Sequence, residues 1–166
     1  EHVGRRATMN RERRRAGEPD DSPSIAAFQA ALRARPALVG ARLNIALLHA
    51  KPFTVRYYEV GPSRLVRPAT LLDYLQDAAA EHASILRIGV QDLHHRDLTW
   101  VLSRLRLTVA RYAGVGETVL VRTWPSTRGS LSSYREFEVL DQAGEIVARA
   151  TTAWVALDMI GRRPVR

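Results

Sequence analysis

Two adjacent ionisable residues, Glu81 and His82, lie within the stretch RPATLLDYLQDAAAEHASILR, residues 67–87. At about 100° per residue, the apolar side chains of this stretch form one helical stripe, with His82 near its centre and Glu81 at its edge. An imidazole can transfer a proton near neutral pH, and a carboxylate beside it can act as a general base or a nucleophile. The pair is therefore a candidate catalytic site. The alternative is a core or pocket-lining histidine that hydrogen-bonds to a strand.

The elements that must position this pair can be outlined from the hydrophobic pattern. The stretch predicts a helix from about 70 to about 87, with Thr70 and Asp73 in a capping arrangement. Runs of β-branched and aromatic residues, several with alternating polarity, predict strands at 53–60, 98–112, 117–128, 130–141 and 145–159. The short, turn-rich links favour antiparallel neighbours. Only a sheet that curls around the helix can bury the apolar stripe, which indicates an α+β fold.

Composition sets limits on the class of protein. The chain has 166 residues, 46% of them hydrophobic and 25% charged, which suits one globular domain. It contains no cysteine, so disulfides and cysteine-ligated metals are excluded and a reducing, cytoplasmic compartment is expected. Asp92, His94 and His95 adjoin one another, but adjacent side chains diverge, so we expect a solvated loop and no metal. No apolar run is long enough to predict a membrane span.

The first 50 residues differ in composition from the rest of the chain. Residues 1–24 are rich in arginine and poor in large apolar side chains, so we expect disorder there. Residues 25–50 could form short helices broken at Pro36 and Gly40. The division expected is thus a basic extension over 1–50 and one domain over 51–166. A nucleic-acid-binding arm is an alternative for the extension, but a charge run without interleaved aromatic residues is weak evidence.

Several segments together resemble the N-terminal half of the acyl-ACP thioesterases. They are FTVRYYEVGP, LLDYLQDAAAEHA, DLTWVLSRLRLTVARYAGVGETVLVRTWPS, YREFEV and ARATTAWVALDMIGRRPVR, and they extend from about 52 to 166. The resemblance implies a hot-dog fold, in which a curved antiparallel sheet wraps one long helix. It implies hydrolysis of the thioester between a fatty acyl chain and acyl carrier protein, without a metal or redox cofactor. In this family the principal catalytic residues belong to a second hot-dog repeat, so we expect them to lie outside this chain.

The resemblance also suggests roles for particular residues. The pocket for the acyl chain would be lined by Leu75, Ala79, His82, Trp100 and Trp124. The net charge of +8 would favour an acidic carrier protein. The contacts with the carrier would come from an outward-facing row made of Arg104, Arg106 and Arg122. A lone hot-dog unit leaves a sheet edge unpaired, so a homodimer is expected. The alternative function is a non-catalytic acyl-binding module from a truncated or split gene.

Overall fold

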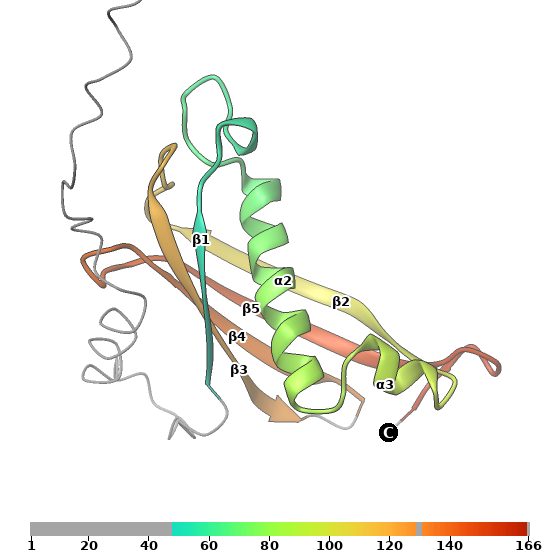
Figure 1. Ribbon diagram of the computed structural model, residues 1–166. Coiled ribbons are helices and arrows are strands. Elements are labelled where there is room, and N and C mark those ends of the chain that lie inside the picture. Colours follow the sequence, from blue (N-terminus) through green and yellow to red (C-terminus); the bar gives the residue numbers. More distant parts are fainter. Residues whose placement is uncertain (1–47, 129–130, 166) are drawn as a thin grey trace, which may run out of the picture.

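The computed structural model describes residues 48–128 and 131–165, which form one curved antiparallel sheet with a long helix across it (Figure 1). The helical elements are a 3-10 turn η2 (Tyr57–Glu59) and two α-helices, α2 (Pro68–Ile85) and α3 (Val90–His94). The strands are β1 (His49–Thr54), β2 (Leu98–Val109), β3 (Thr118–Arg128), β4 (Ser133–Leu140), β5 (Ile146–Asp158) and β6 (Arg163–Pro164). This arrangement confirms the α+β class and the hot-dog fold expected from the sequence.

The strand order within the sheet is β1-β3-β4-β5-β2, with β6 paired to β5. The expectation of antiparallel neighbours along the chain is correct for β3, β4 and β5, which form a meander. It is wrong for β2 and β3, because β1 already occupies the open side of β3. After the helix the chain therefore enters the sheet at the far edge, beside β5, and then crosses back to β3.

The first strand begins and ends earlier than the sequence pattern predicts. It pairs with β3 from His49↔Thr123 to Thr54↔Thr118, so two residues assigned to the extension belong to the sheet. Beyond Thr54 the chain leaves β3 and turns into η2, whose tyrosine side chains Tyr57 and Tyr58 are exposed. The rest of the predicted extension, including the predicted disorder and short helices, lies outside the described residues.

Helix α2 starts two residues before the predicted position. Pro68 occupies its first turn, where the missing N–H costs nothing, and Arg67 is the capping residue. The predicted cap at Thr70 is therefore wrong. Its hydroxyl instead donates to the carbonyl of Glu59, at 3.3 Å, and fastens the helix to η2. The helix ends at Ile85, and Arg87 follows with a positive φ of 59°.

The core lies between α2 and the inner face of the sheet. The helix buries Leu71, Tyr74, Leu75, Ala78 and Ala79 there. Alternate residues of the strands meet them, among them Val119, Val121, Phe137, Val139, Ala148 and Ala150. The edge strand β2 carries a bulge between Leu102 and Arg104, after which odd-numbered residues face inward. The sequence pattern therefore identified the helical stripe correctly except for Ile85, which is 61% exposed, and it identified the inward-facing Leu107 and Val109 of β2.

Candidate functional site

His82 lies in the core, near the C-terminal end of α2, with only 4% of its surface exposed. Its Nδ1 lies 2.9 Å from Nη1 of Arg135, and its ring stacks on that of His49 at a centroid distance of 5.4 Å. Burial, together with the charge of Arg135 and the neighbouring His49, lowers the pKa of His82 to about 4. The imidazole is therefore neutral at pH 7.

Arg135 comes from β4, on the same face as Phe137 and Val139. It is 8% exposed, and its Nη1 also donates to Thr123 Oγ1 at 3.2 Å. Among residues 48–128 and 131–165, no carboxylate forms an ion pair with it. Burial lowers the pKa of Arg135 to about 10, so the guanidinium still carries its charge at neutral pH. A buried cation held by two neutral groups is the most unusual electrostatic feature of this fold.

Glu81 points away from His82, toward the surface. Its carboxylate lies 2.6 Å from Nζ of Lys51, which also contacts Asp77 at 3.0 Å. The side chain of Glu81 is 46% exposed. His49 Nε2 is 3.6 Å from the same carboxylate, but burial lowers the pKa of His49, so this contact is not an ion pair at neutral pH. The two candidate catalytic groups are thus adjacent in sequence without touching each other as an acid–base pair.

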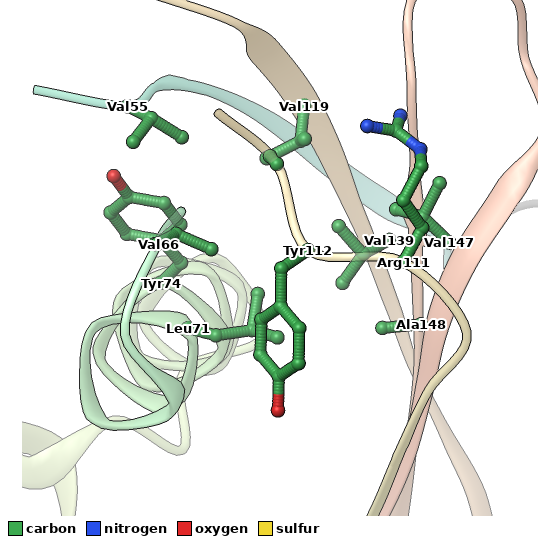
Figure 2. A pocket seen from close by; sticks show the side chains of 11 residues that line it. Val55, Val66, Leu71, Tyr74, Arg111, Tyr112, Val119, Val139, Val147 and Ala148 are labelled. Carbon is green, nitrogen blue, oxygen red and sulfur yellow. The ribbon is translucent and has the colours of Figure 1, made fainter. Parts of the chain in front are cut away.

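The apolar end of the same interior contains a small cavity (Figure 2). Tyr74 and Leu71 of α2 line it from one side, and Val139, Val147 and Ala148 of the sheet from the other. Its volume is about 10 Å³, roughly that of one water molecule. The hydroxyl of Tyr74 turns away to donate to Glu59, at 2.6 Å. A long acyl chain would require these side chains to move apart.

The structure brings together only part of the expected acyl pocket. Leu75 and Ala79 are buried on the same helical face as His82. Trp100 lies on β2, where its indole N–H donates to the carbonyl of Ile88 at 2.9 Å. Trp124 lies on the opposite face of the sheet, because its neighbour Thr123 faces the helix and side chains alternate along a strand. The expectation that Trp124 joins Leu75 and Ala79 in one pocket is therefore incorrect.

The three arginines expected to form one row for the carrier protein differ in their environments. Arg104 and Arg106 are exposed on β2. Arg122 is only 6% exposed and lies 2.6 Å from Glu138, its direct cross-strand partner, with Arg149 on the other side of that carboxylate at 3.6 Å. Its charge is neutralised within the sheet. Arg122 lies on the outer face, as predicted, because its neighbour Thr123 faces the helix, but it is buried and paired with Glu138 and so offers no free charge to a carrier protein.

The sequence reasoning missed His49, Arg135 and Thr123. A signal for Arg135 was present in the segment YREFEV. Alternate residues of a strand face the same side of the sheet, so Arg135 must face inward together with Phe137 and Val139. His49 was missed because the strand was expected to start later. Within the described part of the chain, no cluster of three or more His, Asp or Glu side chains could hold a metal ion. The DLHH segment forms α3 rather than a loop, and no described helix is long and apolar enough to cross a membrane.

Comparison with known proteins gives this fold a family. Residues 46–166 match the family described as acyl-ACP thioesterase N-terminal domain, and the chain belongs to that family. It is 30% identical over 132 residues to a chloroplastic palmitoyl-acyl carrier protein thioesterase of Cuphea hookeriana, covering 75% of this chain and 32% of the relative. The chain thus spans about a third of the length of this curated relative.

Solved structures agree with this assignment. An acyl-ACP thioesterase from Bacteroides thetaiotaomicron matches with a TM-score of 0.70 and 26% identity, over 72% of this chain and 49% of that one. The 12:0-ACP thioesterase from Umbellularia californica matches with a TM-score of 0.66 and 32% identity, over 78% and 50% of the respective chains. The named members of the family are thioesterases, and this chain corresponds to about half of each solved chain.

Proposed function

We propose that this chain is the N-terminal, acyl-binding half of an enzyme that hydrolyses fatty acyl-ACP thioesters. The observation that carries the proposal is the family match, which spans the whole hot-dog unit from 46 to 166. In the reaction, water adds to the thioester carbonyl and the C–S bond breaks. The carrier's thiol leaves with a proton, and the fatty acid is released.

The geometry at the end of α2 supports a catalyst outside the described residues. The carboxylate of Glu81 is bound to Lys51 and is half-exposed on the surface, away from the interior that would hold an acyl chain. Nδ1 of His82 accepts from Arg135, and among residues 48–128 and 131–165 the ring has no hydrogen bond to a nucleophile. These two residues therefore act in binding or packing, and the principal catalytic set belongs to a second hot-dog unit. The alternative is a module that binds acyl groups and catalyses nothing.

The second unit would pair with the β2 edge. This strand has β5 on one side and no strand of the described chain on the other. Val101, Leu102 and Leu105 of β2 are each about 40% exposed, and Ile85 and Ile88 lie exposed at the end of α2. An apolar, unpaired strand edge favours pairing with another sheet. We infer a homodimer through this edge when the chain is alone.

The partner that delivers the substrate would be acyl carrier protein. Arg104 and Arg106 present two positive charges on the outer face of β2, where they could orient an acidic carrier. A cytoplasmic location is part of the same proposal. Imaging a fluorescent fusion of the full gene product tests that location.

The proposed function is tested by incubating palmitoyl-ACP with the purified chain, its Glu81→Gln variant and its His82→Gln variant. We expect binding of palmitoyl-ACP and no palmitate release above the uncatalysed rate by any of the three. Turnover by the wild type that disappears in either variant would place the chemistry in this half. Failure to bind palmitoyl-ACP would refute the proposal as a whole.

A further measurement separates the two candidate functions. The chain is joined to the second repeat of an active family member and assayed for palmitate release. Restored turnover supports the catalytic half. Binding without turnover in a fusion that folds, as judged by circular dichroism, favours the non-catalytic module.

A further inference from the structure

The inner face of the sheet changes from apolar to cationic near the C-terminal end of α2. Moving along β4 from Val139 through Phe137 to Arg135, the buried side chain becomes a guanidinium. Removing a charge from water costs several kcal/mol unless a counter-charge or hydrogen bonds compensate. In the described chain the compensation comes only from two neutral acceptors, His82 Nδ1 and Thr123 Oγ1. Among residues 48–128 and 131–165, no carboxylate pairs with this charge.

The guanidinium retains donors that can bind a negative charge. Both of its hydrogen bonds to described residues use Nη1, leaving the N–H groups of Nε and Nη2. Neither of these nitrogens belongs to the fully buried atoms without a partner, which in the described part are His49 Nε2 and Arg122 Nε. Nε and Nη2 of Arg135 are therefore not fully buried, although the residue as a whole is only 8% exposed. The hydrogen bonds from Nη1 to His82 and Thr123 fix the orientation of the guanidinium group.

The surface next to these donors is apolar and partly open. In the β-sheet register, Arg135 lies opposite Thr152, which in turn lies opposite Leu105. One step further along, Trp154 lies opposite Leu102. Leu102 and Leu105 are 43% and 40% exposed; α2 packs mainly on β1 and β3, and the shorter α3 packs on β2. A cation thus borders an apolar strip formed by Leu102, Leu105 and Trp154.

We propose that Arg135 and this apolar strip form a binding site for a fatty-acid anion. The carboxylate accepts from Nε and Nη2 of Arg135, and the alkyl chain lies along the strip. A planar guanidinium matches a carboxylate through two parallel hydrogen bonds, and the strip buries methylene groups. The inference deepens the proposed function, because a fatty acid is the product of that reaction. It assigns Arg135 as the group that retains the product's head.

Calorimetric titration with laurate tests the site on the whole chain. We expect saturable binding that weakens at least about tenfold in Arg135→Gln, the loss expected for a charge-assisted hydrogen bond. Arg149→Gln is the matched control, since it removes one arginine from the neighbouring strand on the opposite face, and it should change the affinity less than about twofold. Dodecanol, which has the chain without the charge, should not distinguish wild type from Arg135→Gln. Equal laurate affinity in Arg135→Gln and wild type would overturn the proposal.

A second measurement needs no variant, in case Arg135→Gln does not fold. The ¹³C resonance of carboxyl-labelled laurate is followed against pH while bound to the wild-type chain. A neighbouring guanidinium should lower the pKa of the bound carboxyl by about one unit or more relative to free laurate. An unshifted titration would refute the contact with Arg135.

Inorganic phosphate and phosphopantetheine are titrated in parallel, because a guanidinium group also binds phosphate. Binding of these ligands with no binding of laurate would overturn the fatty-acid assignment in favour of the carrier's phosphate. Both experiments measure binding without turnover. A chain that binds laurate through Arg135 but fails to bind palmitoyl-ACP would therefore refute the proposed function alone.

Discussion

The guanidinium of Arg135 donates through Nη1 to Nδ1 of His82, at 2.9 Å. Since a guanidinium has no acceptor atom, Nδ1 must carry the lone pair and any ring proton must be on Nε2. Protonation of Nδ1 would place two cations in contact in a buried site. This single contact makes the charge state of His82 a determinant of stability.

The first prediction concerns pH. The pKa of His82 is about 4 in the folded chain and 6.5 in its unfolded reference, so between these values the unfolded state binds more protons. The free energy of unfolding should therefore fall as the pH drops from about 6.5 toward 4. The full loss is about 3 kcal/mol, to be measured by urea unfolding at several pH values. His49, whose pKa is also lowered, contributes with the same sign.

His82→Gln provides the matched comparison, because its amide oxygen can accept from Arg135 but does not titrate. The difference between wild type and variant isolates His82 from carboxylates such as Glu117 and Asp141, whose lowered pKa values also destabilise the fold in acid. Parallel curves for the two proteins between pH 6.5 and 4.5 would contradict the assignment.

The second prediction concerns the buried pair Arg122–Glu138. Arg122→Ala leaves the Glu138 carboxylate without its 2.6 Å partner in a poorly solvated site. We expect a loss of about 3–5 kcal/mol in the free energy of unfolding, measured in urea. The double variant Arg122→Met, Glu138→Leu should lose clearly less, since it removes both charges. A double variant as unstable as Arg122→Ala would show that packing, rather than charge, explains the loss.

The third prediction concerns the exposed pair Lys51–Glu81. Glu81→Gln should lower the free energy of unfolding by no more than about 1 kcal/mol, because a half-exposed ion pair is screened by water. Phe137→Ala, in the core opposite α2, should cost about 3–5 kcal/mol in the same assay. A larger effect of Glu81→Gln than of Phe137→Ala would mean that this carboxylate has a structural role that the ion pair does not explain.

The fourth prediction concerns assembly. Val101→Lys places a charge on the exposed edge strand β2, where a second sheet would pair. Light scattering should show a dimer for the wild type and a monomer for Val101→Lys. Tyr57→Lys, also exposed but on η2, should remain dimeric. A wild-type monomer at micromolar concentration would refute the proposed homodimer.

The sequence allowed the helix, the β3–β4–β5 meander and the alternation along the second half of β2 to be predicted, because these follow from local periodicity. The order of the strands could not be predicted, since the place of β2 depends on where β1 has already paired. The polar cluster was missed for a different reason. The alternation along the strand places Arg135 on the inner face. Charged residues normally face solvent, however, so an arginine was not expected to be buried there. Trp124 was expected in the pocket because it is a large aromatic residue. The alternation of side chains along β3 instead places it on the outer face of the sheet.

The position of β2 at the far edge of the sheet affects how the chain folds. The β3–β4 and β4–β5 pairings join neighbouring segments, whereas His49↔Thr123 and Leu98↔Asp158 join residues far apart in sequence. Closing the long loops costs chain entropy before the distant contacts compensate for it. The three-stranded meander should therefore form first, followed by docking of β1, α2 and β2. We expect folding on the millisecond-to-second timescale, with the edge strands as the last elements to gain protection from hydrogen exchange.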